Sequence, residues 1–462
     1  MLLLSATCQA QSIRIGENGR HLIQANGEDF LWLGDTAWEL FHRLDKAEAD
    51  HYLQTRAEQG FTVVQAVILA ELDGLRTPNA NGDRPFYDLD PTRPNEAYFE
   101  FVDYVVATAN SLGLTMVLLP TWGDKLPSDH PAAGPIVFNS ENAYSYGEFL
   151  GKRYQNAAVI WMLGGDRKIV SPEVLEIWRS MAAGLASGDG GRHLMSFHPR
   201  GEHSSSYWLH NESWLDFNAF QTGHARHFNS VYDWVTADYL RHPIKPTIDA
   251  EPAYEGIPVR FWEFIDFADP QKVPEGVLDE KGLVKDSSHF AKGFFDDYDV
   301  RIHAYWNLLS GAAGYTYGNN AVWQMYQPGY SLIIPALQDW RAALRSPGAE
   351  DIRWLNELFT RFPLSRLQPD QSLVYGPNRA GEDHIRSAID RTGEFALFYL
   401  SQGQELTAVL GKLKGENLSY SWFNPRDGSV LTGEVIPNQG HYSFASPSSG
   451  AGQDWLLILQ RQ

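Results

Sequence analysis

Short apolar runs alternate with amphipathic segments through roughly the first three quarters of the chain. The amphipathic segments predict helices at about residues 46–59, 95–112 and 141–154, the first with Asp45 as its N-terminal cap and Gly60 as its stop. The apolar runs predict parallel strands, because near-continuous apolar sequence is typical of strands covered on both faces. They lie at residues 30–35, 61–67, 114–122, 158–166, 194–198, 217–221, 246–251 and 314–318. Eight strands alternating with helices predict a (β/α)8 TIM barrel of the α/β class.

The pattern changes from about Gln371 onward. Helical periodicity ends, and short strands such as 395–400 and 454–459 are separated by turn signals, which predicts a small antiparallel β-sandwich domain. The predicted domains are therefore a barrel over residues 11–365 and a sandwich over residues 366–462. No Ser/Gly-rich or Pro-rich linker separates them, so we expect direct packing. A hairpin over residues 13–23 is expected to cap the barrel bottom or join the sandwich.

The N-terminus resembles the end of a secretory signal. Residues 1–10 are apolar and end in small residues, which predicts cleavage after Ala10 and a secreted or periplasmic protein. Cys8 would make it a surface-attached lipoprotein, but the preceding Thr7 fits that motif poorly. Cys8 is the single cysteine, so no internal disulfide forms. No later segment approaches the ~20 apolar residues of a membrane span.

The net charge of −20 makes nucleic acids and anionic membranes poor partners. It leaves the oligomeric state open. The scattered histidines, among them His193, His198 and His203, form no His-x-His pair after the first strand, and no Gly-x-Ser-x-Gly or glycine-rich phosphate loop occurs. We therefore expect no metal, no cofactor and no serine nucleophile.

Polar residues gather where the predicted strands end. The C-terminal ends of barrel strands carry the active site in this architecture. We therefore expect the following side chains to bind substrate: Asp35, Gln65, Trp122, Asp124, Arg167, His198, Gln221, His224, Trp306, Tyr317 and Asn319. Aromatic residues make up 13% of the chain, and flat faces with polar rims suit sugar rings, although core packing accounts for many of them.

Two carboxylates stand out within this group. Asp166 follows an apolar strand and two glycines, and Glu251 ends the seventh strand. Singly, each has a structural alternative, a loop salt bridge with Arg167 for Asp166 and an ion pair with Arg226 or Lys245 for Glu251. Together they face each other across a barrel mouth, which is what a glycosidase requires: one protonated acid and one ionised base or nucleophile.

Several segments resemble the apiosidase-like glycoside hydrolases. Residues 30–38 and 59–65 look like the opening of that family, and residues 161–166 and 246–252 are similar to its two catalytic segments. The resemblance covers roughly residues 13–362. The tail resembles a collagen-binding-type sandwich domain that often follows such barrels, a name that does not itself imply collagen as a partner.

The resemblance implies a retaining mechanism, with Asp166 as acid/base and Glu251 as nucleophile. It also implies an oligo- or polysaccharide substrate, apiose-containing rhamnogalacturonan II in pectin. The motifs do not fix the sugar. A second hypothesis is a non-catalytic glycan-binding barrel, in which the carboxylates only hydrogen-bond sugar hydroxyls. A panel of aryl glycosides and pectic oligosaccharides separates the two.

Overall fold

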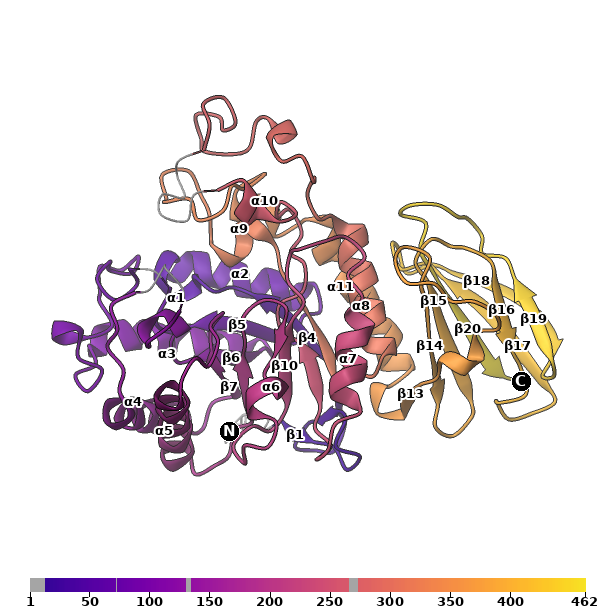
Figure 1. The fold of residues 1–462 in the computed structure, drawn as a ribbon, viewed down its shortest axis with the longest axis horizontal. Helices are drawn as coiled ribbons and strands as arrows, with labels where there is room; N and C mark the ends of the chain where they lie inside the picture. The colour runs from indigo at the N-terminus through magenta and orange to yellow at the C-terminus, as the bar shows by residue number, and fades with distance from the viewer. Residues whose placement is uncertain (1–12, 72, 130–133, 266–272) are drawn as a thin grey trace, which may run out of the picture.

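A nearly closed parallel barrel forms the larger part of the molecule (Figure 1). The computed structural model describes residues 13–71, 73–129, 134–265 and 273–462, and in these residues nine strands form the barrel sheet in the order β8-β7-β6-β5-β4-β12-β11-β10-β9. The parallel strands are β4 (Trp32–Thr36), β5 (Val63–Val67), β6 (Thr115–Leu119), β7 (Val159–Gly164), β8 (Met195–His198), β10 (Asn218–Gln221), β11 (Thr247–Asp249) and β12 (Gly314–Tyr317). The short β9 (His203–Ser204) pairs antiparallel with β10. Because β8 also contacts β10, the ends of the sheet meet, and the predicted fold is confirmed.

Helices follow most strands and cover the outside of the barrel (Figure 1). At the start of α2 (Lys46–Glu58), Asp45 and Glu48 form a capping box, as expected of an Asp followed three residues later by Glu. The remaining α-helices are α1 (Leu40–Arg43), α3 (Glu96–Ser111), α4 (Ser140–Tyr154), α5 (Pro172–Asp189), α6 (Ser206–Leu209), α7 (Val231–Tyr239), α8 (Asp297–Leu309), α9 (Asn320–Trp323), α10 (Trp340–Ala343) and α11 (Pro347–Arg361).

The two faces of each barrel strand belong to different apolar clusters. In β4, Trp32 packs inside the barrel, whereas Leu33 packs against the surrounding helices. Successive strand residues point to opposite faces, so Asp35 must also face the helices. This alternation decides which residues at the strand ends can reach the barrel mouth.

The N-terminal segment forms a three-stranded antiparallel sheet of β1 (Arg14–Ile15), β2 (Leu22–Ile23) and β3 (Asp29–Phe30). Ile13, Leu22 and Phe30 join the apolar cluster that fills the barrel interior, so this sheet caps the barrel and does not join the sandwich. The predicted signal remnant, residues 1–10, lies outside the described residues.

The C-terminal domain packs two antiparallel sheets against each other. One contains β13 (Leu367–Pro369), β14 (Ile385–Asp390), β15 (Phe395–Leu400), β20 (Trp455–Arg461), β17 (Asn417–Phe423) and β18 (Val430–Pro437), and the other contains β16 (Leu406–Val409) and β19 (His441–Phe444). In β15, Phe398 faces the core between the sheets, while Tyr399 faces the barrel. The sheet is therefore apolar on both faces, which explains why no linker is needed.

The interface between the domains combines ring stacking with buried charge. Tyr305 of α8 stacks on Tyr399 with ring centroids 4.6 Å apart. Nearby, Arg301 of α8 lies 3.1 Å from Asp454 of the sandwich and 2.7 Å from Asp351 of α11. Removing one partner from such a buried network is strongly destabilising, so the two domains stabilise each other.

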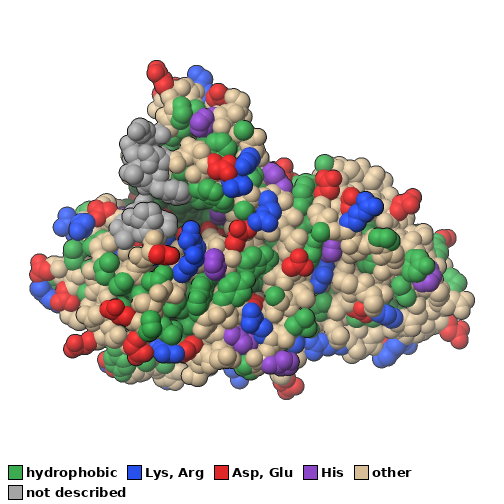
Figure 2. All heavy atoms as spheres, in the orientation of Figure 1, with side chains coloured by type: hydrophobic (Ala, Val, Ile, Leu, Met, Phe, Trp, Pro, Cys, Tyr) green, Lys and Arg blue, Asp and Glu red, His purple; other side chains and the backbone are tan. Residues whose placement is uncertain are grey.

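Two long loops rise above the C-terminal ends of the strands, one after β11 and one after β12 (Figure 1). They contact each other where Tyr326 Oη donates to the carbonyl oxygen of Lys281 and Val284 N donates to that of Ala336. Figure 2 shows a lobe above the barrel and, on this face, interspersed acidic and basic side chains. None of the helices in the described residues combines the length and the apolar character that a membrane crossing requires.

Candidate active site

A pocket of about 460 Å³ opens at the C-terminal ends of the barrel strands, beneath the two raised loops. Its polar lining contains both carboxylates singled out from the sequence. Its polar lining includes Glu71, Asp166, Arg167, Arg200, Gln221, His224 and Glu251. Its apolar wall includes Trp38, Trp122, Tyr254, Phe261, Trp262 and Trp323. A concave site with aromatic walls and few converging polar groups suits a small organic ligand.

The turn after β7 positions Asp166. Gly164 and Gly165 have φ values of 96° and 113°, in a region that side-chain-bearing residues rarely adopt. A Cβ at Gly164 would lie 2.3 Å from the carbonyl oxygen of His198, and one at Gly165 would lie 2.7 Å from Gly123 N. Both glycines are therefore required by backbone conformation and by space. Asp166 itself has a φ of 50°, a strained conformation of the kind found at functional sites.

Asp166 is held weakly by its neighbours. The backbone N–H of Gly201 donates to Oδ1 at 3.2 Å, and Arg167 Nη1 lies 3.6 Å from Oδ2. About a third of the side chain, 36%, remains exposed to the pocket. Burial of the site and the negative charge of Glu251 raise the pKa of Asp166, although Arg167 and His198 oppose the shift. The protonated form of Asp166 is thereby favoured.

Glu251 lies just beyond β11 in the opposite environment. His224 Nε2 lies at hydrogen-bond distance, 3.2 Å, from Oε1, and His198 Nε2 lies 3.1 Å from Oε2. Burial alone would raise the pKa of Glu251, but the two imidazoles outweigh it and lower the pKa to about 2. The side chain is only 9% exposed, so Glu251 is a fixed, ionised carboxylate.

Tyr254 and Trp38 complete the surroundings of Glu251. Trp38 Nε1 donates to Tyr254 Oη at 3.1 Å, and the Tyr254 ring lies 4.6 Å from the His224 ring, centroid to centroid. Burial and the charge of Glu251 raise the pKa of Tyr254, which keeps its hydroxyl protonated. The packed rings fix the position of His224 and, through it, that of Glu251.

The structure brings several of the predicted substrate-binding residues together. Trp122, Arg167, Gln221 and His224 line the pocket with Asp166 and Glu251. His198 is fully buried behind Glu251 and reaches it with its ring nitrogen. These placements put the polar ends of four different strands around one cavity.

Asp35 and Tyr317 were expected in the pocket, but the structure places both on the outer face of the barrel. Asp35 accepts hydrogen bonds from Tyr52 Oη at 2.6 Å and Arg56 Nε at 2.7 Å, both in α2. Tyr317 Oη donates to Glu255 Oε2 at 2.6 Å. The physical reason is strand parity: residues 33, 35, 315 and 317 point away from the barrel axis.

Four further residues predicted for the pocket also lie elsewhere. Gln65 points into the barrel below the pocket and donates to the carbonyl oxygen of Ala250 at 2.9 Å. Asp124 is buried in an ion pair with Lys125, 2.6 Å away. Asn319 caps α9 through the backbone N–H of Ala321.

Trp306 is the last of the four. It lies on α8 at the domain interface, in edge contact with Tyr232 and His384. A helix that follows a strand runs back down the outside of the barrel, so Trp306 cannot reach the mouth.

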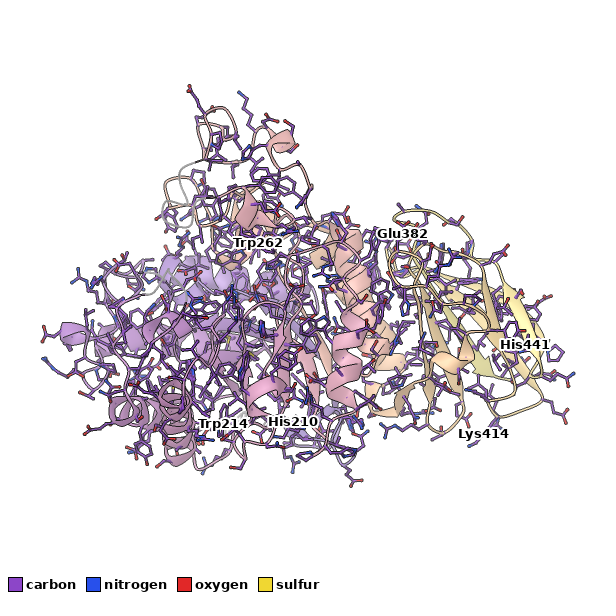
Figure 3. All side chains as sticks on the ribbon, viewed as in Figure 1. His210, Trp214, Trp262, Glu382, Lys414 and His441 are labelled. Atoms are coloured by element: carbon purple, nitrogen blue, oxygen red, sulfur yellow. The ribbon has the colours of Figure 1, made fainter. Side chains whose placement is uncertain are left out.

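Sequence reasoning missed residues that reach the pocket from the loops. Trp262 lies where the raised loops meet the barrel and is 38% exposed (Figure 3). Phe261 and Ile333 line the same wall. None of these residues follows a strand, so no local sequence pattern marks them as pocket residues. Glu71 was also missed, although it ends the apolar run 66–70 and carried the same signal as Glu251.

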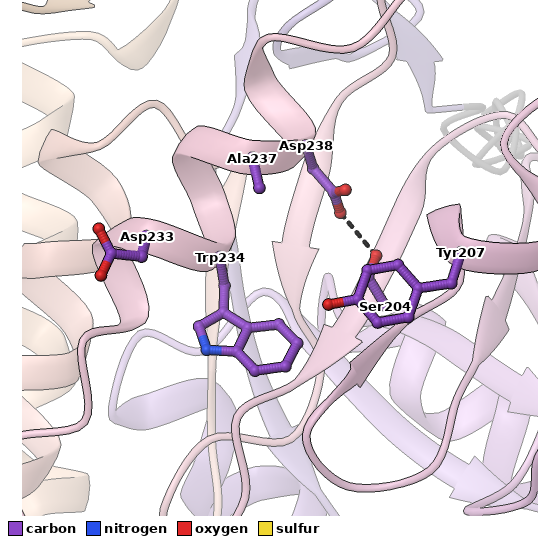
Figure 4. Close-up of a pocket in the computed structure, with 6 residues that line it drawn as sticks. All are labelled: Ser204, Tyr207, Asp233, Trp234, Ala237 and Asp238. Atoms are coloured by element: carbon purple, nitrogen blue, oxygen red, sulfur yellow. Dashed lines mark hydrogen bonds between the residues drawn. The ribbon is translucent and has the colours of Figure 1, made fainter.

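A second, smaller cavity of about 210 Å³ lies between α6 and α7, on the outside of the barrel (Figure 4). Its carboxylate Asp238 accepts hydrogen bonds from Ser204 Oγ at 2.6 Å and Ser206 Oγ at 2.5 Å. The acceptor capacity of Asp238 is thus used within the fold.

In the part of the chain that the structure describes, no group of three or more His, Cys, Asp or Glu side chains could hold a metal ion. His193 is engaged with Asp189 and the carbonyl oxygen of Ala157, and His203 with that of Gly201.

A family model described as "Apiosidase-like, catalytic domain" matches residues 16–366. The chain belongs to this family. A second model, "Putative collagen-binding domain of a collagenase", matches residues 368–460. The apiosidase-like chain is similar to a solved glycoside hydrolase, with 29% identity, a TM-score of 0.82 and coverage of 98% of this chain and 97% of the other.

A glycoside hydrolase of family 5 from Bacteroides vulgatus ATCC 8482 has the same identity and TM-score, and the match covers 98% of this chain and 93% of the other. Among curated proteins, none matches the chain. Family and fold agree that the barrel is a glycoside hydrolase domain.

Proposed function

We propose that this apiosidase-like protein is a retaining glycoside hydrolase acting on pectic glycans, with Asp166 as acid/base and Glu251 as nucleophile. The observation that carries the proposal is the contrast between the two carboxyl groups of one pocket. Histidine contacts lower the pKa of Glu251 to about 2, whereas burial and the charge of Glu251 raise that of Asp166. Two carboxyl groups with pKa values pushed apart are the requirement for a paired acid and nucleophile.

The geometry supports a two-step reaction. Ionised Glu251 attacks the anomeric carbon and forms a covalent glycosyl ester, while Asp166 gives its proton to the departing glycosidic oxygen. The ester carries no negative charge, so the repulsion that raised the pKa of Asp166 disappears. Asp166 is then a better base, and it removes a proton from the water that cleaves the ester.

The aromatic wall supports a sugar substrate. Trp38 and Trp122 pack against each other with ring centroids 5.3 Å apart, and Trp122 also lies beside His198. Aromatic rings next to a carboxylate offer both stacking and hydrogen bonds to a sugar ring. Family membership supports apiose-containing side chains of rhamnogalacturonan II as the first substrate to test. Secretion or periplasmic export would bring the protein to such a polymer.

The experiment is a product analysis with 4-nitrophenyl glycosides and rhamnogalacturonan II oligosaccharides. Release of a sugar whose first-formed anomer keeps the substrate configuration by ¹H NMR supports a retaining hydrolase. An inverted first product would overturn the nucleophile role of Glu251. Binding of an oligosaccharide without turnover would favour the glycan-binding barrel instead.

A further inference from the structure

Glu71 is a third carboxyl group in the pocket, outside the pair that performs the proposed chemistry. It lies in the loop after β5, and the residue before it is anchored. Lys125 Nζ donates to the carbonyl oxygen of Ala70 at 2.8 Å, and Lys125 is itself fully buried beside Asp124. The backbone next to Glu71 is therefore held in place.

The groups around Glu71 do little to stabilise its ionised form. Charges and burial, and no hydrogen bond from a described residue, are the influences on its carboxyl group. Burial and the negative charge of Glu39 raise the pKa of Glu71 to about 8, and Arg167 opposes the shift. The charged groups that face it are Glu39, Asp124, Asp166 and Arg167, with Lys125 paired to Asp124.

Glu71 is partly exposed and lines the same pocket as Asp166, so its carboxyl group is open to a bound ligand. A polar group at a ligand site is expected to form its hydrogen bond with the ligand. We propose that Glu71 is a specificity-determining residue that hydrogen-bonds a hydroxyl group of the sugar bound next to Asp166. The inference rests on the proposed function. A neutral carboxyl group supplies one donor and one acceptor, which matches a pair of neighbouring ring hydroxyls.

The position of Glu71 explains why the neutral form serves this role. An ionised Glu71 would add a further negative charge near Asp166 and Glu251, and it could only accept hydrogen bonds. The neutral form leaves the pairing of Glu251 with its histidines undisturbed. Ligands that lack the contacted hydroxyl would leave Glu71 unpaired and bind less tightly.

The test compares Glu71→Gln and Glu71→Ala with wild type, using the 4-nitrophenyl glycoside that the wild type cleaves fastest. Glu357→Gln, an exposed change on α11, is the control for loss of one charge. At about pH 6 we expect Glu71→Gln to keep KM within about 3-fold, because the amide retains a donor and an acceptor. Glu71→Ala should raise KM by about 10–100-fold with a smaller effect on kcat.

The pH dependence distinguishes binding from a structural role. Near pH 9 wild-type KM should rise because Glu71 has ionised, whereas KM of Glu71→Gln should stay at its value near pH 6. Thermal stability gives a second readout: wild type loses stability as pH rises from about 4.5 to about 8, since only the unfolded chain releases the Glu71 proton in that window. The Tm advantage of Glu71→Gln should therefore grow over this range.

Unchanged KM in both variants at both pH values would overturn the role of Glu71. A lower Tm for Glu71→Ala with wild-type KM in the folded fraction would overturn it as well, because that pattern is purely structural. Failure of the proposed function is distinct, since the wild type itself would then cleave no glycoside in the panel.

Discussion

His224 Nε2 lies 3.2 Å from Glu251 Oε1, and this contact joins the loop after β10 to the end of β11. The opposite oxygen of Glu251 lies 3.1 Å from His198 of β8. Each carboxylate oxygen thus has its own imidazole, one from the end of β8 and one from the loop after β10. The consequence is a carboxylate that stays ionised at low pH and cannot rotate freely.

Replacing His224 with Ala should move the acidic limb of kcat/KM to higher pH. The pKa of Glu251 is about 2 in the intact site, below its usual value, so the ionised form is present above that pH and is lost as pH falls through it. Without His224, only His198 opposes the effect of burial, and the pKa of Glu251 rises. The measurement is a pH–rate profile of the variant.

His441→Ala is the matched control, because His441 is an exposed histidine of the sandwich (Figure 3). It should leave the acidic limb in place. An unchanged acidic limb in His224→Ala would show that His224 does not set the pKa of Glu251.

A second prediction concerns Asp35, whose carboxylate is fully buried with Arg56. Asp35→Ala leaves the guanidinium without its partner and should lower the free energy of unfolding by about 3–5 kcal/mol. KM of the folded fraction should stay near wild type, because Asp35 faces α2 and not the pocket. Denaturant unfolding and kinetics measure the two effects. A raised KM with unchanged stability would instead place Asp35 in substrate binding.

The comparison of Asp35 with Asp166 shows what the sequence could predict. Both follow an apolar run, and the eight strands, the capped helix α2 and the change of pattern at the sandwich were all local signals. The direction in which a strand-end side chain points could not be predicted from the local sequence. A shift of one residue reverses the face, so Asp35 and Tyr317 were assigned to the pocket although they point outward. The glycines before Asp166 were the better signal, because only a sharp turn needs them.

Loop residues lay beyond this kind of prediction. Trp262 and Ile333 come from two loops that are far apart in sequence, and their meeting depends on contacts such as Tyr326 with Lys281. The tertiary fold decides that arrangement. The prediction that Trp306 lines the pocket was wrong for a related reason. Its ring packs between the two domains, and an aromatic residue type alone does not show where in the fold the residue lies.

Gly165→Ala should impair catalysis by displacing Asp166. Gly165 has a φ of 113°, and a Cβ there would lie 2.7 Å from the backbone nitrogen of Gly123. Backbone atoms cannot move aside as a flexible side chain can, so the turn must shift. A displacement of about 1 Å lowers kcat by about 100-fold. The measurement is kcat of the folded variant.

Gly191→Ala is the matched control, since Gly191 also has a positive φ of 66° but nothing lies within 4 Å of a Cβ there. It should cost roughly 1–2 kcal/mol of stability through strain alone and keep kcat. Equal kcat losses in the two variants would mean that general destabilisation, and not the position of Asp166, lowers the rate.

The last prediction assigns the roles of the two carboxylates by chemical rescue. Glu251→Ala should abolish turnover of every glycoside, because no covalent glycosyl ester can form. Asp166→Ala should be less damaging with an activated aryl leaving group, which needs little protonation, although the water step still lacks its base. Azide should restore part of the turnover in both variants, but the products should differ in configuration.

In Asp166→Ala, azide attacks the glycosyl ester of Glu251, and two successive inversions give a glycosyl azide of retained configuration. In Glu251→Ala, azide occupies the space of the missing carboxylate and displaces the leaving group once, which gives the inverted azide. NMR of the isolated azides separates the two outcomes. The opposite assignment of products would exchange the roles of Asp166 and Glu251. Wild-type rates in both variants would mean that neither carboxylate is catalytic and that the chemistry takes place at another site.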